Sequence, residues 1–347
     1  MKALRKVKPA CGCMELAEIP EPQVTPGHVK IRVAFCGICG SDMKFYHWNM
    51  RPGLNIPIPV TFGHEFSGTV VELGEGVTGV AVGERVVSET PEISCGKCEQ
   101  CRTGNTLLCA SKRSIGYQTD GAMAEYIVIR QELLHKIPDN VTFQQAALCE
   151  PAAVAAHAVF DKTTVNPGDF AVVFGPGTIG LLVLQMAKAA GCRVALVGTA
   201  KDQKRLEVGR ALGADEILVA DTEDVPARLR TLTGGRGADV AFECSGAGPV
   251  LDQAVVSLKK MGELVIVSLF RNGEIPISTI NTVVNNEIRI SGSYGQRYGA
   301  WERVLRLLSD GKLNADLVET HVFPLERWQE GFEIAEQGAG IKILLQP

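Results

Sequence analysis

Four cysteines lie within fifteen residues of the chain, and their spacing is that of a metal site. They are Cys95, Cys98, Cys101 and Cys109. One loop with this spacing can surround a single zinc ion with four sulfurs at about 2.3 Å in a closed tetrahedron. Disulfides and an iron–sulfur cluster are the alternatives, and the sequence favours structural zinc because no secretory segment is recognisable. A closed site performs no chemistry, so the catalytic groups must lie elsewhere.

A second set of possible ligands is spread over the first 150 residues. Its members are Cys39, His64, Glu65 and Glu150. They offer one sulfur, one nitrogen and carboxylate oxygens, and a zinc held by mixed ligands with an open position acts as a Lewis acid. Taken singly, His64 reads equally well as a polar core residue. Cys39 with Cys36 reads equally well as a redox pair or as two small core residues.

A glycine-rich turn follows an apolar run at residues 170–174. The turn reads Gly175, Pro176, Gly177, Thr178, Ile179 and Gly180, and an apolar helix is expected directly after it. Gly175 permits the tight turn, Gly177 lets the backbone approach a pyrophosphate, and Gly180 lets helix and strand pack closely. The N-terminus of the helix offers free N–H groups to the phosphates. This combination predicts dinucleotide binding, against the alternative of an ordinary strand–turn–helix.

The choice between NAD and NADP depends on the residues after the second strand. A carboxylate about twenty positions after the glycine turn binds the ribose 2′-hydroxyl of NAD. The strand at 193–197 ends instead in Gly198 and Thr199, and the cationic residues that follow are Lys201, Lys204 and Arg205. We therefore expect these residues to bind the cofactor and NADP to be preferred over NAD.

Composition limits the class of protein. The chain has 347 residues, 46% of them hydrophobic and 21% charged, and a formal net charge of −4. These values are typical of a globular protein of about two domains, without the basic surface that nucleic acid or an anionic membrane requires. The longest apolar region, residues 170–197, is interrupted by Gly, Pro, Lys and Arg, which argues against a membrane span. Eleven cysteines, an odd number, favour a cytoplasmic metalloprotein over a disulfide scaffold.

The order of predicted elements gives an α/β fold class. Residues 1–150 are β-rich, with alternating runs at 29–33, 67–72 and 85–88. After a helical stretch at 152–160, apolar strands alternate with helices, which favours a doubly wound parallel sheet. The strands are expected at 170–174, 193–197, 216–219, 240–243 and 263–268, and the helices at 178–190, 203–212, 225–232 and 250–259. Helices at 300–308 and 325–337 and a strand at 341–345 complete the chain.

Together these motifs resemble those of the zinc-dependent medium-chain dehydrogenases, near the polyol (sorbitol-like) and threonine dehydrogenase branch. The matching residues run through the whole chain: GICGSD at 37–42, GHE at 63–65, the four clustered cysteines, CEP at 149–151 and GPGTIG at 175–180. The resemblance implies a GroES-like catalytic domain at 1–152, with a structural-zinc lobe at about 90–112, and a Rossmann domain at 153–290. Residues 291–347 would return to the catalytic domain, with the active site in the cleft between the two domains.

The resemblance also implies roles for single residues. Cys39, His64 and Glu65 would bind catalytic zinc, with Glu150 as a ligand or a water-bridged neighbour. Ser41 would receive the substrate hydroxyl proton, and Asp42 would orient the metal ligands. Relatives often carry a histidine shortly after the Ser-Asp pair to pass the proton to solvent. Lys44 lies near that position here, and whether His47 substitutes for that histidine is left open.

The expected reaction is hydride transfer between a secondary alcohol and NAD(P), with two zinc ions per chain, one catalytic and one structural. Candidate pocket residues by resemblance are Tyr46, Trp48, Tyr117, Tyr294, Gln296 and Arg297. Their phenols, amide and guanidinium suit a polyol or sugar-derived alcohol. Threonine or a simple secondary alcohol is the alternative substrate, and a non-catalytic dinucleotide-binding protein is the alternative of another class. A homo-oligomer, dimer or tetramer, is expected, with apolar residues at 270–284 available for contacts.

Overall fold

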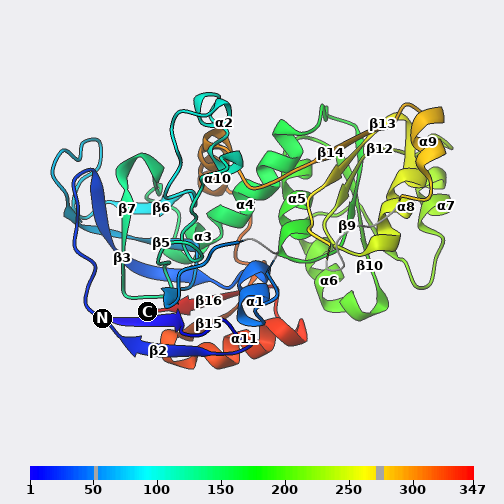
Figure 1. The fold of residues 1–347 in the computed structure, drawn as a ribbon. Coiled ribbons are helices and arrows are strands. Elements are labelled where there is room, and N and C mark those ends of the chain that lie inside the picture. Colours follow the sequence, from blue (N-terminus) through cyan, green and yellow to red (C-terminus); the bar gives the residue numbers. More distant parts are fainter. Residues whose placement is uncertain (51–53, 271–276) are drawn as a thin grey trace. The chain divides into compact units, whose positions relative to one another are not determined.

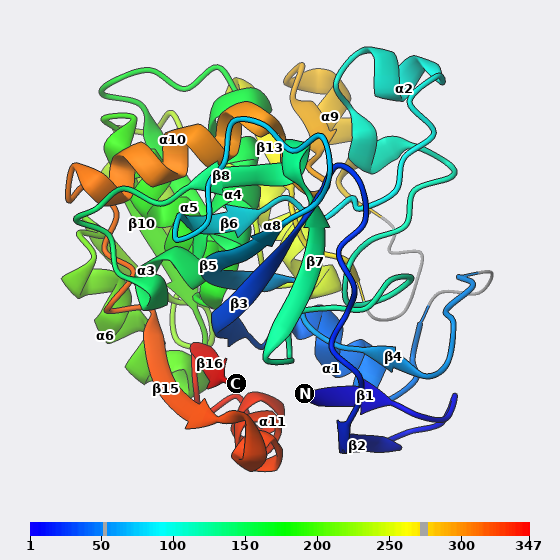
Figure 2. The same cartoon turned by 90° about the vertical axis from the view of Figure 1, so that its left-hand side faces the viewer.

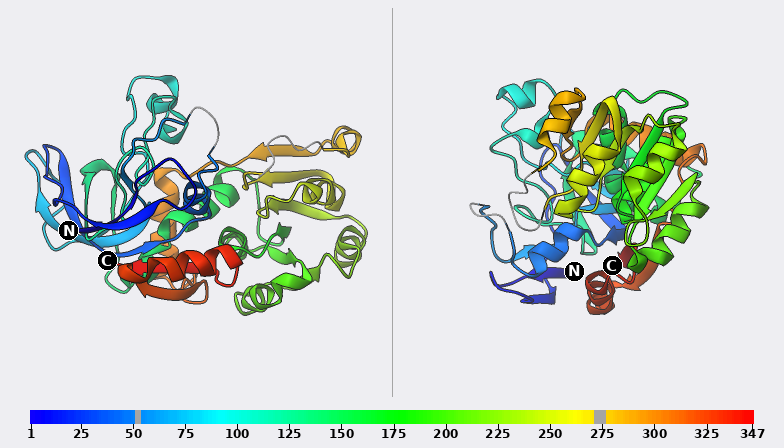
Figure 3. Two further views of the ribbon diagram at one scale, coloured as in Figure 1. Left: turned by 60° about the horizontal axis from the view of Figure 1, so that its bottom comes forward. Right: turned by 90° about the vertical axis from the view of Figure 1, so that its right-hand side faces the viewer.

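The computed structural model describes residues 1–50, 54–270 and 277–347, and these divide into two compact units. Unit 1 comprises Met1–Glu150, Arg297–Ser309 and Glu319–Pro347, and unit 2 comprises Pro151–Gln296 and Asp310–Val318. Both chain ends belong to unit 1 and lie near each other in every view (Figures 1, 2 and 3). The expected return segment, residues 291–347, is interrupted, because 310–318 pack with unit 2.

Unit 1 is built on two mostly antiparallel sheets. The smaller has the order β2-β1-β4, with strands β1 (Lys2–Lys6), β2 (Met14–Glu18) and β4 (Val60–Thr61). The larger has the order β15-β16-β3-β5-β6-β8, with β7 paired to β3 (Figure 2). Its strands are β3 (His28–Gly37), β5 (Glu65–Leu73), β6 (Arg85–Ser88), β7 (Tyr126–Arg130), β8 (Leu134–Lys136), β15 (Glu319–Pro324) and β16 (Lys342–Gln346).

The helices of unit 1 are short, apart from two near the C-terminus. They are α1 (Gly40–Tyr46), α2 (Glu99–Arg102), α3 (Phe143–Ala147), α10 (Tyr298–Ser309) and α11 (Trp328–Gln337), with 3₁₀ turns η1 (Thr106–Leu108), η2 (Gln131–Leu133) and η5 (Leu325–Arg327). The expected strands at 29–33, 67–72 and 85–88 are confirmed within β3, β5 and β6. In β3, Ile31 and Val33 enter the core while Arg32 is exposed, as side-chain alternation along a strand requires.

Unit 2 contains a six-stranded, wholly parallel sheet with the order β11-β10-β9-β12-β13-β14. Its strands are β9 (Phe170–Phe174), β10 (Arg193–Gly198), β11 (Glu216–Val219), β12 (Ala238–Glu243), β13 (Leu258–Ile266) and β14 (Arg289–Gly292). This is the doubly wound order in which the chain reverses direction across the sheet beside its first strand, β9. The predicted α/β class, with a doubly wound parallel sheet in one unit and a β-rich second unit, is confirmed.

Helices cover both faces of this sheet. Figure 1 shows α5 and α6 on one side and α7 and α8 on the other. The bounds are α4 (Cys149–Ala156), α5 (Thr178–Ala189), α6 (Gln203–Ala211), α7 (Val225–Leu232), α8 (Gly248–Ser257) and α9 (Ile280–Asn285), with a π-turn η3 (His157–Asp161) and a 3₁₀ turn η4 (Ala200–Asp202). All five residues of β9 are buried, which explains its uninterrupted apolar sequence.

One helix ends earlier than the sequence suggested. The expected helix at 250–259 stops at Ser257, because Leu258 already pairs with Ala238 of β12 and begins β13. The expected helices at 300–308 and 325–337 lie within α10, η5 and α11, and the terminal strand is β16. Among the described residues, none of the helices combines the length and apolar character that crossing a bilayer would need.

Candidate functional site

The cysteine lobe, residues 95–109, brings its four thiols together as the spacing predicted. The sulfurs of Cys95, Cys98, Cys101 and Cys109 all lie within 4.8 Å of one another, and all four thiols are free. Cys95 Sγ and Cys101 Sγ are 3.9 Å apart. Zinc–sulfur bonds of about 2.3 Å in a tetrahedron give sulfur separations of about 3.8 Å. The lobe therefore fits a four-coordinate zinc ion.

Backbone amides already favour the thiolate form of part of this lobe. The N–H of Cys98 donates to Cys95 Sγ at 3.3 Å, and the N–H of Cys95 donates to Cys109 Sγ at 3.4 Å. Hydrogen bonds from the backbone of Lys97 and Cys98 lower the pKa of Cys95 to about 6. Burial and the Cys98 side chain raise the pKa of Cys101 to about 11. Without a metal, four neighbouring thiols do not all ionise, and a divalent cation would supply the missing positive charge.

The second candidate centre gathers Cys39, His64 and Glu65, whose ligand atoms also lie within 4.8 Å of one another. Cys39 is the N-cap of α1, and His64 and Glu65 stand where the chain enters β5. Gly63, just before them, has φ +92°, and a Cβ there would lie 2.6 Å from Cys36 Sγ. The glycine is needed for the turn that aims the two ligands.

Gly37 has an equally specific reason to be a glycine. It ends β3 opposite Glu65, and a Cβ on Gly37 would occupy the space of the Glu65 carboxylate. The GICG motif thus does two things: Cys39 supplies a sulfur, and Gly37 leaves room for a carboxylate on the neighbouring strand.

Asp42 lies behind these ligands, fully buried. The Cys39 N–H donates to Asp42 Oδ2 at 2.9 Å, and Asp42 Oδ1 lies 3.6 Å from His64 Nδ1. Within the described part of the chain, both Oδ1 and Nδ1 are buried and lack a hydrogen-bond partner. A metal-bound histidine donates its second ring N–H to a carboxylate. The pair is therefore arranged as a metal site needs, with Nε2 left for the ion.

The charges around His64 explain its ionisation. Burial alone lowers the pKa of His64, but Asp42 and the sulfur of Cys39 together raise it well above its usual value. Burial raises the pKa of Asp42 to about 6, against the opposing effect of His64. The metal-free site therefore binds additional protons, because its carboxylates are buried close to one another and away from water. A divalent cation would replace those protons.

Glu150 is the fourth candidate ligand, and it is buried near the same groups without joining the three-residue cluster. Burial raises the pKa of Glu150 to about 7, while His64 and Lys342 act in the opposite direction. Glu65 and Asp42 add repulsion to the Glu150 carboxylate. Glu150 is therefore a candidate for a ligand or for a neighbour joined to the ion through water.

Lys342 is a member of the site that sequence reasoning missed. It lies in β16, is buried, and its Nζ donates to Glu65 Oε2 at 2.5 Å and to the Ile38 carbonyl at 3.0 Å. One oxygen of Glu65 is therefore held by an ammonium, and the other remains for a metal. A lysine inside the apolar run IKILL was the available signal.

Ser41 is joined to the metal ligands on one side and to a phenol on the other. Its hydroxyl donates to Cys39 Sγ at 3.0 Å and accepts from the Tyr117 hydroxyl at 2.5 Å. The ring of Tyr117 also lies 5.2 Å from that of His64. Burial raises the pKa of Tyr117 well above its usual value, so this phenol keeps its proton at neutral pH.

The remaining pocket candidates lie in other surroundings. Tyr46 and Trp48 have their rings beside the Lys6 ammonium, and Arg297 donates to Asn105 Oδ1 at 2.7 Å near the cysteine lobe. Tyr294 is half-exposed and Gln296 is buried, both in unit 2. His47 contacts Cys11 and Glu336, and the hydrogen bond to Ser41 comes from Tyr117.

The glycine turn has the geometry expected of a dinucleotide loop. Gly175 has φ +100°, and a Cβ there would lie 2.9 Å from the backbone of Ser245. A Cβ on Gly180 would collide with the Gly175 carbonyl. Around Gly177, the N-cap of α5, a Cβ would meet no atom within 4 Å. Open space over the helix N-terminus is what a pyrophosphate requires. Pro176 precedes Gly177, and Thr178 and Ile179 form the first turn of α5.

The end of β10 differs in one respect from the expectation. Thr199 was expected to donate to a 2′-phosphate, but its hydroxyl donates to Asp202 Oδ2 at 2.7 Å and its N–H to the same oxygen at 2.9 Å. Asp202 is therefore turned back onto its own loop. Gly198 ends β10, Lys201 and Lys204 are exposed, and Arg205 is half-buried.

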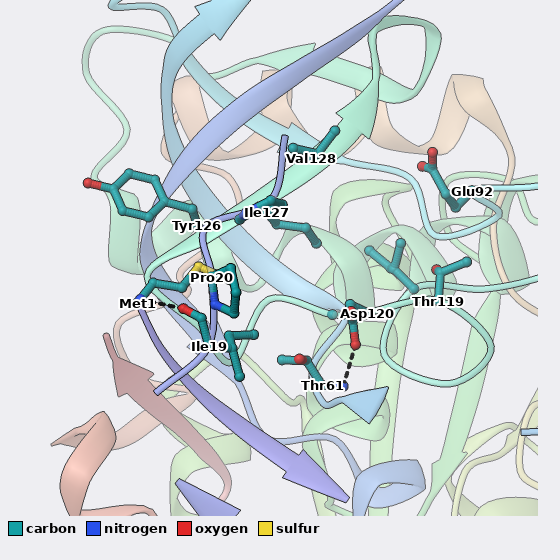
Figure 4. A pocket seen from close by; sticks show the side chains of 13 residues that line it. Met1, Ile19, Pro20, Thr61, Glu92, Thr119, Asp120, Tyr126, Ile127 and Val128 are labelled. Carbon is teal, nitrogen blue, oxygen red and sulfur yellow. Dashed lines mark hydrogen bonds between the residues drawn. The ribbon is translucent and has the colours of Figure 1, made fainter. Parts of the chain in front are cut away.

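A cavity of about 220 Å³ in unit 1 lies away from these ligands (Figure 4). Its lining includes Ile19, Pro20, Thr61, Asp120 and Tyr126, and none of the metal-ligand candidates. The candidate metal centres therefore lie outside this cavity.

Comparison with known proteins identifies the family of the chain. Residues 25–139 match the Alcohol dehydrogenase GroES-like domain, and residues 178–310 match the Zinc-binding dehydrogenase family. Sorbitol dehydrogenase of Halalkalibacterium halodurans is 42% identical over 100% of this chain and 99% of its own length. L-threonine 3-dehydrogenase of Pyrococcus abyssi is 35% identical over 99% of this chain and 98% of its own.

Solved structures give the same result. The crystal structure of 2R,3R-butanediol dehydrogenase from Bacillus subtilis superposes with a TM-score of 0.89 at 38% identity, covering 100% of this chain and 99% of that one. The chain is an NAD(P)-linked dehydrogenase, and it belongs to the zinc-binding medium-chain alcohol dehydrogenase family.

Proposed function

We propose that this enzyme interconverts a secondary alcohol, polyol or sugar-derived, and its ketone, using zinc and NADP or NAD. The observation that carries the proposal is the convergence of Cys39, His64 and Glu65, with the buried Asp42 carboxylate behind His64. In this proposal unit 1 is the catalytic domain and unit 2 binds the dinucleotide.

Cys39, His64 and Glu65 would hold the catalytic zinc, with Glu150 beside them. When bound, a zinc ion with an open position would supply Lewis acidity at the substrate oxygen, and a nicotinamide cofactor would supply the redox chemistry. The protein's own part is placement and proton transfer. Asp42 fixes the tautomer of His64, and Lys342 holds one oxygen of Glu65.

Ser41 would accept the proton that the substrate hydroxyl gives up. Its oxygen already accepts a hydrogen bond from the Tyr117 hydroxyl. If that bond reverses, Tyr117 takes the Ser41 proton and gives its own proton to a solvent water, so that one proton leaves and neither hydroxyl stays charged. Tyr117 thereby takes the relay role that the sequence left open for His47.

Structural zinc in the cysteine lobe completes the proposed metal content of two ions per chain. The sulfur separation of 3.9 Å between Cys95 and Cys101 supports this assignment. Because all eleven cysteines are free, a reducing, cytoplasmic location is proposed with it.

For the cofactor, we propose NADP over NAD. β10 ends in Gly198, without a carboxylate for the ribose 2′-hydroxyl, and the Asp202 carboxylate is occupied by Thr199. Lys201 and Lys204, both exposed, are the cations that would meet a 2′-phosphate, with Arg205 beside them. A kcat/KM ratio that favours NAD by tenfold or more would overturn the preference.

We further propose a homo-oligomer, dimer or tetramer. Edge strand β14 and the exposed side chains of Ile280 and Val284 on α9 support contacts in this region. Part of the apolar segment expected from the sequence, residues 271–276 with Ile275, lies outside the described residues.

A substrate screen tests the proposal. Purified enzyme is assayed with polyols, L-threonine and simple secondary alcohols, each with NADP and NAD, following the absorbance of the reduced nicotinamide. We expect the highest kcat/KM with a polyol or sugar alcohol. L-threonine is the second candidate, because one relative is an L-threonine 3-dehydrogenase. A higher kcat/KM with L-threonine than with any polyol would contradict the first proposal.

His64→Ala and Cys39→Ser variants provide the controls. Each should lose one of two zinc ions and nearly all turnover while keeping a wild-type circular dichroism spectrum. Wild-type activity in either variant would contradict the ligand assignment.

A further inference from the structure

A cysteine, a histidine and a glutamate form a hydrogen-bonded chain on the surface of unit 1, apart from both metal centres. Cys11 Sγ lies 3.4 Å from His47 Nδ1, and His47 Nε2 lies 2.9 Å from Glu336 Oε1. Cys11 comes from the loop between β1 and β2, His47 caps the C-terminus of α1, and Glu336 lies on α11. Three separate segments of the chain thus each contribute one side chain to this hydrogen-bonded series.

The partners of the two His47 ring nitrogens indicate which of them carries the proton. A carboxylate only accepts hydrogen bonds, so the proton of the His47 ring stands on Nε2, facing Glu336. Nδ1 is then left to accept the proton of the Cys11 thiol. A nucleophile within reach of a base, with the base oriented by a third group, is the arrangement that activates a thiol.

A buried ammonium lies directly under the same loop. Lys6 is fully buried, and its Nζ donates to the carbonyls of Ala10 and Gly12, the two residues that flank Cys11, at 2.6 and 2.9 Å. A third bond, 2.9 Å long, goes to the Tyr46 carbonyl at the end of α1. These three bonds tie the loop that carries Cys11 to the end of α1, which carries His47.

The loop also carries a second thiol. Cys13 follows two residues after Cys11, and it is only half-buried. Gly12 and Cys13 have φ of +70° and +35°, so the chain turns sharply between the two sulfur-bearing residues. Cα atoms two residues apart are separated by at most about 7 Å in an extended chain, and a turn shortens this separation toward the range that a disulfide bridges.

We propose that Cys11 is a peroxide-reactive thiol, with His47 as its base, and that Cys13 is the thiol that resolves the oxidised form. This site is independent of the dehydrogenase reaction proposed above. Its substrate class is a hydroperoxide, and its product is a Cys11–Cys13 disulfide.

Oxidation of the two thiols takes place in two steps. His47 Nδ1 takes the proton of Cys11, and the thiolate sulfur attacks a hydroperoxide oxygen, so that an S–O bond forms and the O–O bond breaks. The leaving oxygen takes the proton back from His47 and departs as water or an alcohol, which leaves a sulfenic acid on Cys11. The Cys13 sulfur then attacks Cys11, the S–O bond breaks, and water departs with the Cys13 proton. Two thiols lose two electrons, and one hydroperoxide gains them.

His47 connects this site with the catalytic helix. It caps the C-terminus of α1, a helix of seven residues whose N-cap is Cys39.

The test uses the zinc-loaded enzyme and hydrogen peroxide at neutral pH. In a Cys13→Ser variant, dimedone trapping and peptide mass spectrometry give the rate of sulfenic acid formation at Cys11. We expect this rate to exceed that of a synthetic peptide with the sequence of residues 7–16, carrying the same serine, by about tenfold or more. In the wild type we expect the peptide that contains both cysteines to lose two hydrogen atoms.

Variants of the chain identify the base and its partner. On the Cys13→Ser background, His47→Asn should slow the reaction to near the peptide rate, and Glu336→Gln should slow it less. Glu333→Gln, an exposed glutamate on the same helix, is the matched control and should leave the rate unchanged. A Cys11 rate equal to that of the peptide, or a rate unchanged by His47→Asn, would overturn the proposal. Persistence of a sulfenic acid in the wild type would overturn the role of Cys13.

Discussion

The ammonium of Lys342 donates to Glu65 Oε2 at 2.5 Å, and both side chains are almost completely buried. β16 brings the lysine from the far end of the chain to a carboxylate that stands beside Cys39 and His64. The C-terminal strand is therefore part of the candidate metal centre as well as part of the sheet.

Replacing Lys342 by Met should separate the structural and metal-binding roles of this pair. We expect the metal-free protein to lose about 3 kcal/mol of unfolding free energy, because Glu65 becomes a buried charge without a partner. With zinc bound the loss should be smaller, because the ion neutralises the carboxylate. Urea unfolding with and without zinc measures both values, with the exposed Lys312→Met as control. Equal losses in the two states would contradict this account.

Asp42→Asn tests the group behind His64. The amide keeps the size of the side chain but removes the charge that faces Nδ1, so we expect zinc affinity to fall by about 10- to 100-fold. Competition with a chromogenic chelator measures the affinity, and thermal unfolding shows whether the fold survives. An affinity within twofold of wild type would show that Asp42 serves only to cap α1.

Tyr117→Phe tests the proton path. The variant loses the hydroxyl that donates to Ser41, and we expect kcat to fall by about 10²-fold while zinc content stays at two per chain. KM should change little, since the ring remains. Tyr126→Phe, in the cavity of Figure 4, is the control. Full activity in Tyr117→Phe would show that the proton leaves Ser41 through His47 or water and not through Tyr117.

Zinc affinity of the catalytic centre should rise with pH. Burial raises the pKa of Glu150 to about 7 and that of Asp42 to about 6 in the metal-free protein, so both carry protons at the acidic side of this range. Zinc binding must displace those protons, and affinity therefore weakens as pH falls from about 8 to about 6. Chelator competition at several pH values measures the slope, and Glu150→Gln should flatten it. A wild-type affinity that does not change with pH would rule out this proton release.

Cys98→Ser should act on the cysteine lobe alone. We expect the variant to lose one zinc ion and several degrees of Tm, because the loop has lost a ligand that holds its shape. The kcat of the molecules that remain folded should stay near wild type. Elemental analysis, thermal unfolding and activity per folded molecule are the measurements, and loss of kcat at unchanged Tm would contradict a structural role.

The sequence was most informative where one local pattern fixes one local structure. The apolar run at 170–174 and the glycines after it predicted β9, its turn and α5, since turn geometry and burial leave few alternatives there. The spacing of Cys95, Cys98, Cys101 and Cys109 predicted a shared site because all four lie in one loop.

Contacts between distant segments were not predictable in this way. Lys342 reaches Glu65 only because β16 pairs with β3, and Cys11 reaches His47 only because the β1–β2 loop packs against the end of α1. The expected role of Thr199 was not met for a related reason. Its hydroxyl donates to Asp202, three residues later, and the sequence does not indicate which acceptor a hydroxyl will choose.

Gly37 limits variation at a position that offers no ligand atom of its own. A single methyl group at Gly37 would overlap the Glu65 carboxylate and force it away from its place beside Lys342. Every other amino acid has a Cβ atom, so any substitution at Gly37 would disturb the candidate metal centre without removing one of its ligands.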